Sequence, residues 1–321
     1  MSWASSGGPG RMAGGGAVVA RAPAKVNLHL AVGPLREDGY HELRTVYLAV
    51  SLFDTVTVRP GAGLTVTVTG EGAAGSGTDA VPTDRRNLVW QAAELLAERA
   101  GVPADADITI DKSIPAAAGL AGGSADAAAA LVALDALWGT HATRGELGAL
   151  AARLGSDVPF SLVGGVALGS GRGEQLSPVL ARRRWDLVLG ISGEGLSTPT
   201  VYAELDRLRA EGRVPDGEVH PSPDPVIAAL RSGPVRALAS SLANDLQPPA
   251  LSLRPDLRRA LRAATGAGAA AAIVSGSGPT VAALAPDEAA AVRMAATLAG
   301  EGVYRTVRAV HGPVPGARLV G

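Results

Sequence analysis

The sequence predicts an α+β protein built from two domains that meet near residue 180. Strand-like and helix-like runs alternate along the chain, and its second half reads strand, helix, strand, strand, helix, strand, the order typical of a ferredoxin-like domain. Apolar residues form 47% of the 321 residues, which is ample for two cores. We therefore expect domains over residues 17–180 and 181–321, preceded by a disordered Ser/Gly-rich tail over residues 1–16.

Composition excludes several classes of function. The net charge of −1 predicts no nucleic-acid or membrane-surface partner, and the lack of cysteine removes disulfides and cysteine-ligated metal sites. The tail has no apolar segment typical of a signal peptide, and no run is long enough to span a membrane. The histidines show no metal-ligand spacing (positions 29, 41, 141, 220 and 311). We expect a cytoplasmic protein, a monomer or weak homodimer, that acts on small molecules.

Strands open the first domain. Residues 18–32 alternate apolar side chains on one face with Lys25, Asn27 and His29 on the other. That polar face is either the wet side of an antiparallel sheet or a functional surface. Lysine occurs only at Lys25 and Lys112, and arginine supplies every other basic residue, so both lysines are candidates for a specific role. Further strands are predicted over residues 43–52, 55–59 and 64–69.

Helices dominate the rest of the first domain. A helix is predicted over residues 87–100, a strand over 108–110, and an alanine-rich helix over 127–138. The helix over residues 143–154 carries a capping box, because Glu146 lies three residues after Thr143. Asp157 then opens a short element, where local sequence alone favours a helix N-cap, and an apolar strand follows over 162–168.

The second domain begins with a buried strand over residues 185–191 and a helix over 198–209 with Pro199 in its first turn. After a Pro/Asp-rich loop over 211–225, helices are predicted over 225–231, 235–242 and 249–264. Strands over 270–274 and 280–284 flank a glycine loop, and a helix over 288–299 and a strand over 304–310 follow. These elements supply the ferredoxin-like order.

The glycine-rich stretch over residues 115–126 predicts an anion site. It joins a strand to a helix, and Gly119, Gly122 and Gly123 leave backbone N–H groups uncovered. Ser124 and Asp126 favour a helix start, and a helix N-terminus attracts phosphate. The alternative is a helix that merely begins after a flexible turn. The spacing fits neither a Walker A loop, which has a lysine after its glycines, nor a dinucleotide-binding fingerprint.

Three separated motifs together resemble the superfamily of small-molecule kinases that includes galactokinase, homoserine kinase and mevalonate kinase (the GHMP kinases). They lie at residues 22–28, 115–125 and 276–280. Further motifs resemble one family within it, the 4-diphosphocytidyl-2-C-methyl-D-erythritol kinases, and lie at residues 38–43, 87–89, 155–160, 171–174 and 244–246. The resemblance spans about residues 17–310, and several motifs in order are far more specific than one glycine loop.

The resemblance implies a two-domain GHMP kinase fold, with a ribosomal-protein-S5-like N-terminal domain and a ferredoxin-like C-terminal domain. It also implies ATP-dependent phosphorylation of the 2-hydroxyl of 4-diphosphocytidyl-2-C-methyl-D-erythritol in the non-mevalonate route to isopentenyl diphosphate, with Mg²⁺ accompanying ATP. One rival is a homoserine or mevalonate class kinase, although those substrates carry no base to stack on Tyr40 and His41. The other rival is a non-catalytic nucleotide-binding protein, although Lys25 and Asp157 are both present.

At the ATP end of the site, the resemblance implies that Asp157 accepts the proton of the substrate hydroxyl and that Lys25 neutralises charge on the transferred phosphoryl group. Asn87 and Lys112 are expected to contact nucleotide, with a helix cap and a surface lysine as their alternatives. The loop differs from the family pattern in two ways. It contains many alanines, whose backbone N–H groups can still contact phosphate where φ is negative. It also has a single hydroxyl, that of Ser124, to contact Mg-ATP. The loop residues expected to bind ATP are Pro115, Ala116, Ala117, Ala118, Gly119, Leu120, Ala121, Gly122, Gly123, Ser124 and Ala125.

At the substrate end, the resemblance implies that Tyr40 and His41 hold the cytosine ring, by stacking and by a hydrogen bond to its edge. The alternative is an exposed loop pair. Tyr202 is a candidate for the other half of an aromatic sandwich, with a buried helix tyrosine as its alternative. The remaining residues expected to orient or cover the substrate are Asn27, Gly276, Ser277 and Gly278.

Overall fold

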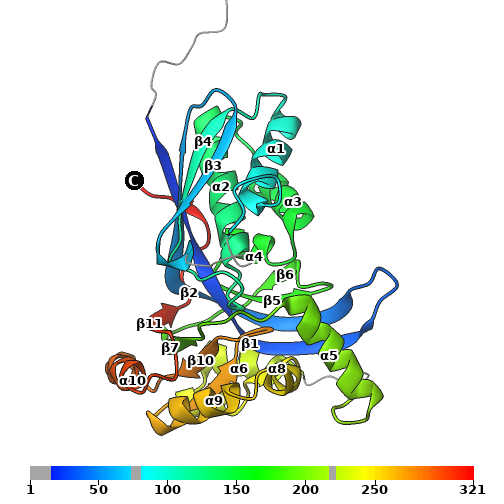
Figure 1. The fold of residues 1–321 in the computed structure, drawn as a ribbon, viewed down its shortest axis with the longest axis vertical. Helices are drawn as coiled ribbons and strands as arrows, with labels where there is room; N and C mark the ends of the chain where they lie inside the picture. Colours follow the sequence, from blue (N-terminus) through cyan, green and yellow to red (C-terminus); the bar gives the residue numbers. More distant parts are fainter. Residues whose placement is uncertain (1–15, 74–80, 217–221) are drawn as a thin grey trace, which may run out of the picture.

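The computed structural model describes residues 16–73, 81–216 and 222–321. The expected disordered tail, apart from its last residue, and part of the expected loop over 211–225 lie outside these residues. Helices and strands assemble into two sheets with helices packed on them (Figure 1). The predicted α+β class is confirmed.

Most strands of the larger sheet come from the first 180 residues, and β8 and β12 join it from later in the chain. Its strand order is β12-β1-β2-β4-β3, with β5 and β6 continuing from β2 and β8 pairing with β1. Helices α1 to α4 pack against the sheet and one another, and α2 lies directly on β1 and β2 (Figure 1). The elements are β1 (Val18–Leu35), β2 (His41–Arg59), β3 (Leu64–Thr69), β4 (Ala106–Asp111), β5 (Val166–Ser170), β6 (Gln175–Pro178), β8 (Ala243–Asn244), β12 (Arg318–Leu319), α1 (Leu88–Ala100), α2 (Gly122–Trp138), α3 (Arg144–Leu154) and α4 (Val158–Val163).

A long antiparallel ribbon of β1 and β2 runs from this sheet to the far side of α5 (Thr198–Ala210) (Figure 1). The predicted strands over 43–52 and 55–59 are one continuous strand, β2. The polar face of β1 is not wet: Lys25, Asn27 and His29 are all buried. Buried polar side chains must find partners, so this burial favours the functional reading of that face over the solvent-exposed one.

The smaller sheet has the order β11-β7-β10-β9, with all neighbouring strands antiparallel. In chain order its strands are the fourth, first, third and second, so the ferredoxin-like prediction is confirmed. Helices α9 and α10 bury alanine, leucine and methionine side chains against it. The elements are β7 (Trp185–Ile191), β9 (Ala271–Val274), β10 (Val281–Leu284), β11 (Thr306–Gly312), α6 (Asp224–Ser232), α7 (Val235–Ala239), α8 (Gln247–Leu253), α9 (Leu257–Gly266) and α10 (Glu288–Gly300).

Several predicted boundaries were wrong, for local physical reasons. The single helix expected over 249–264 is two helices, α8 and α9, because Pro255 between them lacks an N–H group and its ring opposes a continuing helix. Helix α4 extends to Val163, so β5 starts at Val166, later than expected. Helix α2 begins at Gly122, and Ser124 and Asp126 lie inside it instead of capping it.

The capping box on α3 is confirmed, since Thr143 and Glu146 make both of its hydrogen bonds. The proposed domain boundary near residue 180 stays a prediction, and two short strands complicate it. Both β8 and β12 follow that boundary in sequence, yet both pair with β1 in the first sheet. In the part of the chain that the structure describes, no helix is both long and apolar enough to cross a membrane.

Candidate active site

The three motifs singled out in the sequence meet at one place. The backbone N–H of Lys25 donates to the carbonyl of Leu120 at 3.2 Å, and the Ser275 hydroxyl donates to the carbonyl of Gly119 at 3.3 Å. Gly119 has φ +76°, and a Cβ there would lie 2.4 Å from the carbonyl oxygen of Ser275. Glycine is therefore required at residue 119 for the second and third motifs to approach each other.

A cavity of about 670 Å³ opens where these motifs meet. It receives side chains from β1, β2, α5 and the start of α2, which are far apart in sequence. The predicted site residues that line it are Lys25, Asn27, Tyr40, His41, Ala117, Ala118, Gly119, Ala121, Gly122, Gly123, Ser124, Asp157, Tyr202, Gly276 and Ser277. Those that do not line it are Asn87, Lys112, Pro115, Ala116, Leu120, Ala125 and Gly278.

An ion pair lies in the cavity wall. The ammonium of Lys25 is 3.5 Å from Oδ2 of Asp157, and it donates a hydrogen bond to Oδ1 of Asn27 at 2.8 Å. The Lys25 side chain is 7% exposed and that of Asp157 is 27% exposed. The Lys25 ammonium is thus shielded from water and bonded to Asn27 and Asp157. The Asp157 carboxylate remains partly exposed to the cavity.

Asp157 occupies the N-cap position of α4, but its side chain makes no capping hydrogen bond. Instead, Oδ1 accepts a hydrogen bond from the Tyr47 hydroxyl at 3.0 Å. The helix-cap interpretation explains why Asp157 lies at the start of α4. It does not explain why its carboxylate bonds to Tyr47 instead of to the helix backbone. Its placement beside an ammonium and at the cavity surface favours a chemical role.

Sequence reasoning missed Tyr47, which lies on β2, 110 residues before its partner. Two glycines make room for its ring, since a Cβ at Gly173 would lie 2.4 Å from the Tyr47 hydroxyl and one at Gly169 would lie 2.7 Å from its ring. Burial, reinforced by the charge of Asp157, raises the pKa of Tyr47 well above its ordinary value. The hydroxyl therefore stays protonated and always donates. A rare aromatic residue in a chain with 3% aromatics was the available signal.

Replacing Tyr47 with phenylalanine is expected to lower kcat by about tenfold, because a hydrogen bond to a charged group contributes about 1.5–3 kcal/mol. The readout is ADP release at saturating substrates. Tyr304→Phe is the matched control. The buried Tyr304 hydroxyl donates to the carbonyl of Ala260 on α9, beside the smaller sheet, and Tyr304 does not line the cavity. Equal losses in the two variants would contradict a role for Tyr47 in orienting Asp157.

Asn27 connects the ion pair to the sheet. Its Nδ2 donates to the Thr45 hydroxyl at 2.7 Å, and that hydroxyl donates to the carbonyl of His29 at 2.8 Å. On the other side, a Cβ at Gly276 would lie 3.1 Å from Oδ1 of Asn27 and 3.3 Å from the ammonium of Lys25. A side chain at residue 276, which has φ +56°, would crowd the polar face of β1, and glycine avoids both the crowding and the backbone strain.

The motif around residue 244, which carried no assigned role from sequence, holds that glycine loop in place. Nδ2 of Asn244 donates to the carbonyls of Val274 and Gly276, both at 2.8 Å. Asp245 accepts from the backbone N–H of Val32 at 2.9 Å. Asn244 at the end of β8 and Asp245 just after it therefore connect the glycine loop to β1.

The N-terminus of α2 faces the same cavity. The N-cap residue Ala121 offers no side-chain cap, so the first N–H groups of the helix have no partner within it. Gly122, Gly123 and Ser124 line the cavity at this point. Uncapped donors and the positive end of the helix dipole fit a phosphate group.

The expected geometry of the loop alanines needs a correction. Ala117 has φ +51° and Ala121 has φ +59°, so these two alanines occupy the left-handed region that disfavours a Cβ. The prediction that alanine serves here with negative φ is wrong for both residues. Leu120 and Ala125 are fully buried in the first core, and Pro115 and Ala116 line a separate cavity of about 540 Å³ behind the loop.

Lys112 is neither a surface lysine nor a cavity residue. Its ammonium lies 2.6 Å from Oδ2 of Asp54 and 2.6 Å from Oδ2 of Asp126, and all three side chains are almost completely buried. Burial alone would lower the pKa of Lys112, but the two carboxylates outweigh it and raise that pKa. Burial also raises the pKa of Asp126 well above its usual value. In this arrangement Lys112 is buried away from the cavity and holds α2 against the sheet.

Replacing Lys112 with methionine is expected to lower the free energy of unfolding by about 3–5 kcal/mol, because two buried carboxylates lose the ammonium between them. Chemical denaturation measures the change. Arg85→Met is the control: its side chain is 81% exposed and pairs with Glu94, so its loss should cost less than about 1 kcal/mol. A Lys112→Met protein as stable as the control variant would refute the structural role.

Aromatic rings gather at the other end of the cavity. His41 and Tyr202 are stacked, with ring centroids 5.1 Å apart and an interplanar angle of 29°. Tyr40 is 52% exposed, and the guanidinium of Arg172 lies 4.9 Å from its ring centroid. Tyr202 belongs to α5, and its ring packs on that of His41, the first residue of β2; its role as the other half of an aromatic sandwich stays a prediction. Sequence reasoning gave no role to Arg172, although it lies in a quoted motif.

Two remaining predicted residues take local positions. Ser277 shares a hydrogen bond with the Thr198 hydroxyl at 2.9 Å, which ties the glycine loop to the start of α5. Asn87 caps α1, with Oδ1 accepting from the backbone N–H of Val89 at 2.8 Å. The capping alternative for Asn87 is thus present, and its neighbour Leu88 lines the cavity.

Comparison with known proteins agrees with this geometry. The family descriptions "GHMP kinases N terminal domain" and "GHMP kinases C terminal" match residues 87–165 and 226–303. A 4-diphosphocytidyl-2-C-methyl-D-erythritol kinase of Rhodococcus jostii is 59% identical over 303 residues, covering 94% of this chain and 95% of that protein. The corresponding kinase of Mycolicibacterium smegmatis is 56% identical over 307 residues, covering 95% and 93%.

Solved structures give the same result. A crystal structure of a 4-(cytidine 5'-diphospho)-2C-methyl-D-erythritol kinase is 34% identical, with a TM-score of 0.71 over 94% of this chain and 99% of that one. The homoserine kinase of Cytophaga hutchinsonii is 18% identical with a TM-score of 0.72 over 98% and 100%, a likeness of fold alone. With this fold, this site and relatives of such identity over nearly its whole length, the chain belongs to the 4-diphosphocytidyl-2-C-methyl-D-erythritol kinase family of the GHMP kinases.

Proposed function

We propose that this chain transfers the γ-phosphoryl group of ATP to the 2-hydroxyl of 4-diphosphocytidyl-2-C-methyl-D-erythritol, a step of the non-mevalonate route to isopentenyl diphosphate. One observation carries the proposal beyond family membership. A single cavity holds the Lys25–Asp157 pair and the start of α2, together with Tyr40, His41 and Tyr202. Such a cavity supports a phosphoryl-transfer site and an aromatic base site that open to the same space.

The chemistry needs positioning and charge neutralisation more than covalent catalysis. Asp157 accepts the proton of the substrate hydroxyl through the face of its carboxylate that remains open. The Tyr47 hydroxyl holds that carboxylate in place at 3.0 Å. Lys25, 3.5 Å away, stabilises the negative charge that develops on the transferred group.

ATP is held on the other side of the reacting hydroxyl. The uncapped N–H groups at the start of α2 and the Ser124 hydroxyl receive its phosphates. Mg²⁺ usually keeps several waters and binds through substrate phosphates with one or two protein oxygens, and the Ser124 hydroxyl beside the start of α2 would fit that role. Magnesium supplies charge neutralisation of the triphosphate when it is bound. Over the described residues, no group of three or more His, Asp or Glu side chains forms a dedicated metal site.

The base end distinguishes this proposal from a homoserine or mevalonate class kinase. The substrates of those enzymes present no aromatic ring, whereas His41 and Tyr202 form a stacked pair beside the exposed ring of Tyr40. Stacking on such rings contributes about 1–3 kcal/mol per base. A non-catalytic nucleotide-binding protein would have no need for a carboxylate held open beside an ammonium.

The test is a coupled ADP-release assay with three alcohols: 4-diphosphocytidyl-2-C-methyl-D-erythritol, homoserine and mevalonate. Turnover on the cytidyl substrate alone supports the proposal. Turnover on homoserine or mevalonate instead would keep the phosphoryl-transfer site and overturn the base site. ATP binding by calorimetry without ADP release from any alcohol would favour the non-catalytic alternative.

A further inference from the structure

We propose that Asp206 acts as a specificity-determining positioning residue: it sets the tautomer of His41 so that the site accepts cytosine and rejects uracil. This inference rests on the proposed function and deepens it. It concerns a residue on α5 to which sequence reasoning gave no role, and which lines the cavity beside the aromatic cluster.

The contact between the two side chains defines which ring nitrogen carries the proton. Nε2 of His41 lies 3.0 Å from Oδ1 of Asp206. An ionised carboxylate can only accept hydrogen bonds, so Nε2–H of His41 must be the donor. In a neutral imidazole the other nitrogen, Nδ1, then carries a lone pair and acts as an acceptor.

The surroundings hold the imidazole in this arrangement, while the Asp206 side chain is 44% exposed. The His41 side chain is 5% exposed, and its ring is stacked on Tyr202, which lies one helical turn before Asp206 on α5. Farther along that helix, Arg209 donates to the carbonyl of Gly33 at 3.0 Å and anchors α5 to β1. The imidazole is therefore not free to rotate and present either nitrogen at will.

An Nδ1 acceptor distinguishes the two pyrimidines. Cytosine carries an exocyclic amino group that donates hydrogen bonds, and uracil carries a carbonyl oxygen at the same position, which only accepts. An acceptor fixed at Nδ1 therefore receives a hydrogen bond from the amino group of cytosine. It faces the carbonyl oxygen of uracil with no hydrogen between them. The opposite tautomer, with hydrogen on Nδ1, would offer a donor and favour uracil at that position.

The kinetic test compares the cytidyl substrate with its uridyl analogue. A site built around one hydrogen bond discriminates by about 1–3 kcal/mol, or roughly 5- to 150-fold, and we expect the wild-type protein to prefer the cytidyl substrate within that range in kcat/KM. Asp206→Ala should reduce the preference at least about fivefold through KM, with kcat on the cytidyl substrate changed less than about threefold. Asp206→Asn, which offers both a donor and an acceptor, should give an intermediate preference.

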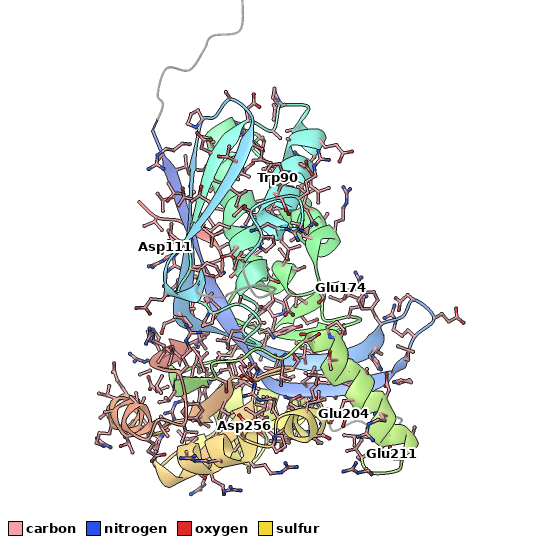
Figure 2. All side chains as sticks on the ribbon, viewed as in Figure 1. Trp90, Asp111, Glu174, Glu204, Glu211 and Asp256 are labelled. Atoms are coloured by element: carbon pink, nitrogen blue, oxygen red, sulfur yellow. The ribbon has the colours of Figure 1, made fainter. Side chains whose placement is uncertain are left out.

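Glu211→Gln is the matched control. Glu211 is an acidic residue at the C-terminal end of the same helix, pairs with Arg207 at 2.6 Å, and does not line the cavity (Figure 2). Its replacement removes one negative charge from α5 without touching His41. We expect the control to keep the wild-type preference for the cytidyl substrate.

The tautomer itself is measured by nitrogen NMR of ¹⁵N-histidine-labelled protein, with the His41 signals assigned from a His41→Gln variant. The expected result is a neutral ring protonated at Nε2 in wild type and a mixture of tautomers in Asp206→Ala. A ring protonated at Nδ1, or an imidazolium, in the wild-type protein overturns the inference. So does an unchanged cytidyl preference in Asp206→Ala.

Failure of the underlying function looks different from failure of this inference. If the wild-type protein releases no ADP with the cytidyl substrate, the proposed function falls and this inference falls with it. If turnover is normal and only the preference is insensitive to Asp206, the function stands and the positioning role of Asp206 is rejected.

Discussion

Asp157→Asn is expected to lower kcat by about 10²–10⁴-fold, the range associated with loss of a general base. The amide is nearly the same size as the carboxylate and can still accept the Tyr47 hydrogen bond, but it cannot take the substrate proton. The KM values for both substrates should change only slightly, because the phosphate contacts at α2 and the aromatic cluster remain. Steady-state ADP release measures both parameters.

The fold provides the control for this experiment. The Asp157 side chain makes no capping hydrogen bond to α4, so the variant should unfold at nearly the wild-type denaturant concentration. ATP binding by calorimetry should also persist. A folded Asp157→Asn protein with near-normal turnover would sink the assignment of Asp157 as the base.

Lys25→Met is expected to reduce kcat by about 10²–10³-fold, comparable to the loss of one preorganised charge-stabilising donor. Methionine preserves the length of the side chain but removes the ammonium that lies 3.5 Å from Asp157 and 2.8 Å from Asn27. The charge on the transferred phosphoryl group then loses its neighbouring cation. The same assay, run to saturation in both substrates, separates kcat from KM.

Lys25→Arg tests whether charge alone is sufficient. The guanidinium keeps the positive charge, but it is larger and planar, and it would replace a side chain that is 7% exposed and donates to Oδ1 of Asn27 at 2.8 Å. We expect only partial recovery relative to Lys25→Met. If Lys25→Met raises KM and leaves kcat unchanged, Lys25 binds substrate and does not stabilise the transition state.

Much of the fold followed from local patterns. Alternation predicted β1 and β3, the capping box predicted α3, and the order of elements predicted the ferredoxin-like sheet. Errors arose where a nonlocal partner or a single breaker decided the outcome. Pro255 divided one expected helix into two, and packing against the sheet let α2 begin at Gly122 without a side-chain cap.

The candidate site divides in the same way. Motifs named Lys25, Asp157 and the glycine loops, because their residue types and spacing are properties of short stretches. The partners of these residues were hidden, because Tyr47 lies 110 residues from Asp157 and His41 lies 165 residues from Asp206. No local pattern encodes contacts across such distances. The packing of α4 against the sheet creates the first contact, and the docking of α5 against β1 and β2 creates the second.

The sequence by itself determined the family and the class of chemistry, and it singled out Asp157 and Lys25 as the candidate base and its neighbouring cation, since these depend on which residues occur in which motif. The tertiary structure decided which alternatives survive. It buried the polar face of β1 and committed Lys112 to Asp54 and Asp126. It also left the Asp157 carboxylate open beside Lys25. The physical reason is desolvation. The groups that pack around a charged side chain decide whether it stays in water, stabilises the fold as a buried ion pair or faces a cavity where it can react.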